Sequence, residues 1–175
     1  MALFRKLFSS DQKEPDDVFL GLRAQAMHVK PADLGIGVDE AAPIFGVLME
    51  TGYEAGSATF LCLADGTVSL YTSTGGGVIG SGEHEAVRAA CLEMLSWTNQ
   101  YANEFLAAGQ PAREYPLPGV GRVFFYLLST HGVYLAKCSE ARLTSDRDPF
   151  SDLFKSCHMV LAKAREETES QQTGE

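Results

Sequence analysis

Residues that could do chemistry are concentrated between Tyr71 and Glu85. Five of the twelve residues from Thr74 to Glu85 are glycine, and the segment joins an expected strand to an expected helix. Dense glycine permits positive φ angles and the close approach of another group, as in phosphate cradles, but it also builds plain tight turns. The segment is therefore our candidate binding site for a ligand or a partner. Its expected contact residues are Tyr71, Thr74, Gly75, Gly76, Gly77, Ser81 and His84.

The pattern Gly75-x-Gly77-x-x-Gly80 has the form of the dinucleotide-binding fingerprint. The strands expected before it suggest hairpins and not a βαβ unit, and no acidic residue ends a strand about 20 residues later. The Gly-Lys-Ser/Thr of a P-loop is also missing. Glu83 and Glu85 place carboxylates at the helix start, where a phosphate would otherwise bind. A simple helix cap is the favoured interpretation.

The spacing of the residues does not match other catalytic motifs. The residue four positions after His84 is Arg88, which cannot supply the second zinc ligand of a His-Glu-x-x-His motif. Ser81 lacks the spacing of a Gly-x-Ser-x-Gly nucleophile elbow. Cys157 and His158 are neighbours on an expected helix and point about 100° apart. We therefore expect no catalytic residue, no metal site and no cofactor.

Composition describes an ordinary globular protein: 175 residues, 45% hydrophobic and 21% charged. The net charge is -9, and four of the negative charges lie in residues 166–175, which leaves -5 for the rest of the chain. Without a basic stripe, nucleic acid is not an expected partner. Four widely spaced cysteines in apolar surroundings, with no secretion signal, predict reduced thiols and a cytoplasmic location. They are Cys62, Cys91, Cys138 and Cys157.

The first half of the chain predicts one helix and three strands. Residues 1–8 place Leu3, Phe4, Leu7 and Phe8 on one helical face, a weak candidate for membrane contact, and residues 1–14 are expected to be flexible. Pro15, Asp16 and Asp17 open a helix that continues to about His28. Strands follow at 44–51, 59–63 and 68–72, joined by turns that contain Gly52 to Gly56 and Asp65-Gly66.

The second half begins with the helix expected to be the longest, at about 83–107. Met94 and Tyr101 on this helix are expected to form a dimer surface. A connection rich in proline and glycine leads to strands at 123–128 and 133–138, the first of which is apolar enough to be covered on both faces. An apolar stripe after Asp148-Pro149 predicts the final helix. Residues 166–175 are expected to be a disordered acidic tail.

These elements predict one α+β domain over residues 15–165, with the order α-β-β-β-α-β-β-α and a mainly antiparallel five-stranded sheet packed with helices. The protein resembles the secretion-chaperone-like fold of type III secretion chaperones and related bacterial regulators. The similarity lies in the order of the elements, the small acidic chain and the amphipathic last helix. The segment Ser69 to Gly80 is also similar to uncharacterised bacterial hypothetical proteins.

The resemblance implies a bacterial, cytoplasmic homodimer without enzymatic activity that binds another protein, as secretion-chaperone-like proteins hold an extended client by apolar patches and strand addition. We expect such a chaperone-like or regulatory module, because no motif favours catalysis. The alternative is a small-molecule-binding protein or enzyme that uses residues 71–85, where His84 between two acids could act as an acid or base.

Overall fold

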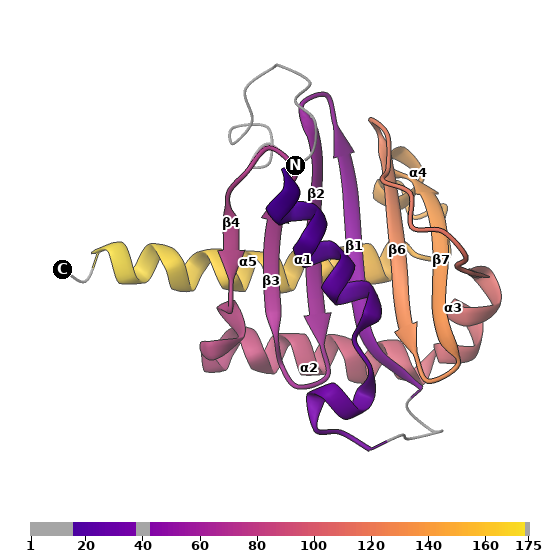
Figure 1. The fold of residues 1–175 in the computed structure, drawn as a ribbon, viewed down its shortest axis with the longest axis horizontal. Coiled ribbons are helices and arrows are strands. Elements are labelled where there is room, and N and C mark those ends of the chain that lie inside the picture. The colour runs from indigo at the N-terminus through magenta and orange to yellow at the C-terminus, as the bar shows by residue number, and fades with distance from the viewer. Residues whose placement is uncertain (1–15, 38–42, 174–175) are drawn as a thin grey trace.

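The chain forms one antiparallel sheet with helices on both faces (Figure 1). The computed structural model describes residues 16–37 and 43–173, so the expectations for residues 1–8 and for the flexible segment 1–14 lie outside the described residues. The elements before the first long helix are α1 (Asp17–His28), the 3-10 helix η2 (Pro31–Leu34), β1 (Ile44–Tyr53), β2 (Gly56–Leu63), β3 (Val68–Thr72), β4 (Gly77–Ile79) and the 3-10 helix η3 (Ser81–Glu83). The elements that follow are α2 (Glu85–Gln100), α3 (Ala102–Ala108), β5 (Gln110–Pro111), β6 (Arg122–Ser129), β7 (Gly132–Ser139), α4 (Glu140–Thr144) and α5 (Ser151–Thr173).

The described residues confirm the α+β class and the antiparallel pairing, but their sheet has seven strands and not the expected five, and the element order differs accordingly. The strands lie side by side in the order β4-β3-β2-β1-β6-β7-β5. The two unexpected strands are the short outer ones. β4 forms where the glycine-rich segment folds back on β3, and β5 is a two-residue pairing of Gln110 and Pro111 with β7.

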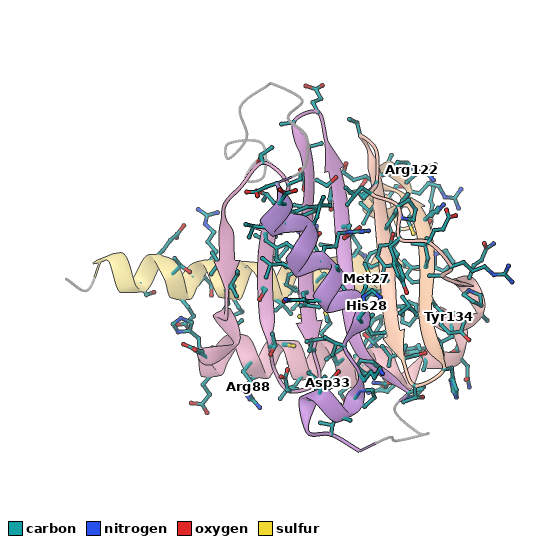
Figure 2. All side chains as sticks on the ribbon, viewed as in Figure 1. Met27, His28, Asp33, Arg88, Arg122 and Tyr134 are labelled. Carbon is teal, nitrogen blue, oxygen red and sulfur yellow. The ribbon has the colours of Figure 1, made fainter. Side chains whose placement is uncertain are left out.

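Two apolar layers enclose the sheet. On one face, α2 and α5 cover residues such as Phe60 and Phe125. On the other face, α1 covers residues such as Leu48 and Tyr126. Met27 and His28, labelled in Figure 2, mark the C-terminal end of α1, where Met27 packs into this second layer. The prediction that the 123–128 strand is covered on both faces is confirmed, because residues 123–128 of β6 alternate between the two layers and all six are buried.

α1 begins at Asp17 and α5 at Ser151, each within two residues of the start that the sequence predicts. The Asp16 Oδ1 atom accepts a 3.0 Å hydrogen bond from Val18 N in the first turn of α1. Asp148 Oδ1 accepts a 3.1 Å bond from Phe150 N, directly before α5. α5 continues to Thr173, and the disordered tail expected from residue 166 is wrong for residues 166–173. Ion pairs one turn apart support this extension, for example Arg165 with Glu169.

The helix expected at 83–107 is two helices. α2 ends at Gln100, Tyr101 leaves helical geometry with φ -117° and ψ 24°, and α3 starts at Ala102. Met94 faces the interior, is 4% exposed and contacts Cys157 of α5, with 3.7 Å between the sulfur atoms. The expectation that Met94 lies on an open dimer surface is therefore wrong, whereas Tyr101 is 45% exposed.

Candidate functional site

The glycine-rich segment forms the tight β3–β4 hairpin. The Thr72 amide donates to Gly76 O at 3.1 Å, and the Thr72 hydroxyl donates to Gly75 O at 2.9 Å. A Cβ atom on Gly77, where φ is 147°, would lie 2.2 Å from the Leu70 carbonyl oxygen. Gly75 and Gly76 also have positive φ, and Thr74 beside them is half-buried. Backbone geometry thus accounts for these glycines without a bound phosphate.

The predicted contact residues do not meet at one point. Gly77 pairs with Tyr71 at one end of β4, whereas Ile79 pairs with Ser69 at the other, and the chain reaches Ser81 only beyond that end. Ser81 is buried, and His84 Nδ1 lies 3.9 Å from Glu167 Oε2 of α5. The structure therefore separates the glycine turn from Ser81 and His84 by the length of β4.

A buried polar cluster, which we did not predict, lies beneath α1. The guanidinium of Arg23 donates from Nε to Glu50 Oε1 at 2.6 Å and from Nη2 to Glu50 Oε2 at 2.9 Å. The Thr59 hydroxyl donates to the same carboxylate at 3.0 Å. Arg23 also donates to the Tyr126 hydroxyl and to Pro116 O, and Tyr126 donates to Pro116 O. This network fixes α1 over β1, β2 and β6.

Burial raises the pKa of the Glu50 carboxyl, against the opposing effect of the Arg23 guanidinium. Burial alone would lower the pKa of Arg23, but its hydrogen bonds and charge contacts with Glu50 and Tyr126 outweigh this effect, and its pKa is raised. Glu50 is fully shielded from solvent, so its carboxylate cannot reach a substrate in this conformation. The Arg23–Glu50 pair therefore has a structural role, because it fixes the position of α1 over the sheet. The sequence signal was the lone charge in the apolar stretch Ile44–Thr51.

A small groove lies between α1 and the edge of the sheet. Its cavity volume is about 160 Å³, and no charged side chain is among its described lining residues. They are Leu22, Gln25, Ala26, Val29, Leu61, Ser69, Tyr71 and Ile79. Tyr71 is 4% exposed, its ring meets Phe19 edge-on, and burial raises the pKa of its hydroxyl, for which the described residues offer no hydrogen-bond partner. We call this hollow the α1–β4 groove.

The strand beside the α1–β4 groove is an apolar edge. β4 pairs with β3 on one side and is the outermost strand of the described sheet, at the left in Figure 1. Ile79 is 65% exposed and Val78 42% exposed, and consecutive strand residues point to opposite faces. Val18 of α1, one helical turn before Leu22, is also 65% exposed. Apolar surface therefore extends from the groove onto its rim.

A larger pocket lies at the end of the sheet where η2, the start of β1 and α2 meet. Its cavity volume is about 610 Å³. The described lining residues are Pro31, Ile36, Gly37, Ile44, Phe45, Ala64, Leu92, Leu95, Ser96, Asn99, Gln100 and Thr130. The buried Oγ1 atom of Thr130 has no hydrogen-bond partner among the described residues. We call this hollow the sheet-end pocket.

The cysteines provide no reactive thiol in this structure. All four are buried and unpaired as disulfides. Burial raises the pKa of the thiols of Cys62 and Cys157, and it raises that of Cys138 to about 12, so the nucleophilic thiolate is disfavoured. Within residues 16–37 and 43–173, no group of three metal-ligating side chains could hold a metal ion. In the same ranges, no helix has the length and apolar character that crossing a membrane requires.

Comparisons with known proteins provide no further guide to the site. No family model matches the chain, and no curated protein or solved structure is similar enough to count as a match.

Proposed function

We propose that this protein is a non-enzymatic binding module, chaperone-like or regulatory, that holds an extended apolar segment of another protein along β4 and in the α1–β4 groove. The observation that carries the proposal is Ile79, which lines the groove and is 65% exposed on an edge strand. Edge strands usually carry charge, proline or a cover, because an open apolar edge invites pairing with another chain. Exposed apolar surface of this kind typically marks an interaction site.

The chemistry of the groove defines the expected partner. Strand addition takes its affinity from backbone hydrogen bonds and its specificity from pockets that receive alternate side chains. β4 offers the backbone edge, and the α1–β4 groove beside it offers one pocket without a charged lining residue. We therefore expect a partner segment that is extended, places an uncharged apolar side chain in the groove, and carries little negative charge, since the body of this chain is itself acidic.

The homodimer and the cytoplasmic location remain predictions from the sequence. Tyr101 is the part of the expected dimer surface that is open, and its ring lies 5.3 Å from that of Trp97, between centroids. The alternative function, a small-molecule site within residues 71–85, has weaker support because Gly77 and His84 lie at opposite ends of β4.

The proposal is tested by exchanging one exposed apolar residue for a charge. Ile79→Asp places a carboxylate at the rim of the groove, and the desolvation of that charge should weaken partner binding at least about 10-fold. Wild-type and variant proteins would be purified gently from the native host and their bound proteins quantified by mass spectrometry. The affinity of peptides from any enriched partner would then be measured by calorimetry.

Met159→Asp is the matched control, because Met159 is 69% exposed on α5 and lies outside the described groove lining. We expect the partner to be lost from Ile79→Asp and kept by Met159→Asp, with both variants folded. A partner that both variants retain, or that both lose, would contradict the proposed surface.

A further inference from the structure

We propose that residues 1–8 of this chain bind its own α1–β4 groove and the open edge of β4, where they compete with the partner segment. This inference rests on the proposed function only for the identity of the site whose access it controls. Covering an apolar edge strand is one of the ways in which proteins prevent it from pairing with other chains. The occupant is identified by the place where the described chain begins, by its apolar side chains and by its charge.

The described chain begins beside the turn of the β3–β4 hairpin. The Asp16 amide donates to Ser73 O at 3.0 Å, and a Cβ atom on Gly75 would lie 3.7 Å from Asp16 Oδ2. Residues 1–15 therefore join the described chain at the end of the hairpin where β4 starts. A segment that returned from this point along β4 would run antiparallel to it, which is the orientation of every neighbouring strand pair in the described sheet.

The link to residues 1–8 is long enough for this path. At about 3.3 Å per residue, Ile79 lies at most roughly 13 Å from Gly75. Phe8 precedes Asp16 by eight residues, which span as much as about 26 Å when extended. Phe8 can thus reach Ile79. Tethering also holds it near the site at an effective concentration on the order of mM, so even a weak contact would be well populated.

The apolar residues of this segment match the exposed surface of β4 on both of its faces. β4 exposes Ile79 on the face of the groove and Val78 on the opposite face. In an extended segment, alternate side chains share a face, so the four apolar residues divide into two on each side. They are Phe4 and Phe8 on one face, and Leu3 and Leu7 on the other. A helical segment would use its backbone hydrogen bonds internally and leave the β4 edge unpaired.

The α1–β4 groove has room for one aromatic ring. Its volume is about 160 Å³, and an apolar cavity of roughly 150 Å³ is large enough to bind benzene. Tyr71 gives the groove an aromatic wall, against which a second ring can pack edge-on. We assign this ring to Phe8, because it lies closer along the chain to Asp16 than Phe4 does.

The charge of the segment favours the same contact. Residues 1–8 contain Arg5 and Lys6 and no acidic residue, whereas the whole chain has a net charge of -9. Attraction between a basic segment and an acidic body supports binding, although at exposed positions it contributes little affinity. Residues 1–8 thus have the chemistry that we expect of the partner, with apolar side chains and no negative charge.

A disulfide cross-link tests the contact without any partner. The four native cysteines are buried, so Phe8→Cys combined with Ile79→Cys adds the two thiols under test. Diamide, which oxidises two thiols to a disulfide, should join them within one molecule at low protein concentration. The product would be identified by mass spectrometry of the unreduced digest.

The matched control combines Phe8→Cys with Glu54→Cys. Glu54 is exposed at the β1–β2 turn, and Gly56 of the same turn lies against Ser73, to which the Asp16 amide is bonded. The control thiol is therefore close to the point where the segment leaves the described chain. We expect the Ile79 pair to form at least about 10-fold faster than the Glu54 pair, because docking raises the effective concentration only at the groove.

A second measurement follows the exposure of the groove. The thiol of Ile79→Cys alone would be alkylated with iodoacetamide and its rate measured by mass spectrometry. Adding Phe4→Ser and Phe8→Ser removes both rings and should raise this rate at least about 3-fold, because the uncovered state becomes more populated. Ser9→Ala with Ser10→Ala changes two neighbouring residues that carry no apolar side chain and should leave the rate unchanged.

Equal cross-linking of the Ile79 and Glu54 pairs, or an alkylation rate that the loss of both rings leaves unchanged, would overturn the inference. Cross-links that form only between two molecules would assign residues 1–8 to a second copy of the chain and would likewise overturn it. Neither measurement needs a protein partner, so their failure leaves the proposed function intact. Retention of the partner by Ile79→Asp would contradict the proposed function and leave the cross-link result unaffected.

Discussion

The carboxylate of Glu50 and the guanidinium of Arg23 form a bidentate contact, and both residues are buried. Buried ion pairs contribute little net stability, because desolvation costs about as much as the attraction returns. Their contribution is to specificity, since a shifted helix would leave a buried charge without its partner. We infer that the pair sets the position of α1, and thus the shape of the α1–β4 groove, more than it sets the total stability.

Replacing Arg23 or Glu50 alone should destabilise the protein far more than replacing both together. Arg23→Met and Glu50→Leu each leave one buried charge unpaired, and we expect each to lower the free energy of unfolding by about 3 to 5 kcal/mol. The double variant should lose much less than the sum. Urea denaturation of all four proteins in a double-mutant cycle measures the coupling. Additive losses would show that the two side chains do not depend on each other.

Both residues of this pair stand out in the sequence, but the sequence does not show that they contact each other. Glu50 interrupts an apolar strand, and Arg23 falls between Phe19 and Ala26 on the helix expected to end at about His28. Each residue alone is compatible with a solvated position. Only the packing of α1 across the sheet brings them together, and helix placement over a sheet is not encoded in local periodicity.

At the scale of elements, the glycine-rich β3–β4 hairpin predicts which of its glycines has no room for a Cβ atom. Both Gly76 and Gly77 have positive φ, which costs an alanine about 1 to 2 kcal/mol. Gly77→Ala must also move the Leu70 carbonyl, whereas a Cβ on Gly76 meets open space. Urea denaturation should therefore show a clearly larger loss of stability for Gly77→Ala than for Gly76→Ala.

Gly119→Ala serves as the neutral control for this pair, since its Cβ would meet no atom within 4 Å. Equal losses at Gly76 and Gly77 would show that close packing against Leu70 does not determine the need for glycine in this hairpin.

Elements with strong local patterns were predicted well, and short elements were missed. The strand at 68–72 and the helix ending at His28 agree with β3 and α1. β4 and β5 were missed because glycine and proline usually mark turns, and only pairing with β3 and β7 makes Gly77 and Pro111 extended. The break at Tyr101 was missed because the apolar spacing continues across it to Phe105.

At the scale of the whole molecule, burial of tyrosine and cysteine predicts loss of stability at alkaline pH. Burial raises the pKa of Tyr53 and of Cys138 to about 12, and it raises the pKa of Tyr71 and Tyr126 as well. Because the unfolded chain releases these protons at lower pH than the folded one, it binds fewer protons in this interval, and rising pH favours unfolding.

The free energy of unfolding, measured in urea, should therefore be flat with respect to these groups below about pH 9 and fall between about pH 9 and 12. Each group contributes at most roughly 1.4 kcal/mol per pH unit. Tyr53→Phe removes one of them and should make the fall shallower. A wild-type profile that stays level up to pH 12 would show that these groups titrate alike in the folded and unfolded states.

The architecture as a whole was predictable in class and in its central layers. The uninterrupted apolar run at 123–128 identified β6 as a strand covered on both faces, and the stripe after Asp148 identified α5. The site was less predictable. The sequence predicted a single site made of residues from the glycine-rich segment. The groove instead combines Tyr71 with Leu22 and Leu61, which lie on elements distant in sequence.

The Arg23–Glu50 contact also constrains how this protein can evolve. A mutation of either residue alone produces a protein with an uncompensated buried charge, so selection would remove most such single variants. Descendants of this gene should keep both residues or replace both, for instance with an apolar pair, and the two positions should covary although 27 residues separate them. The groove beside α1 would then be inherited together with this pair.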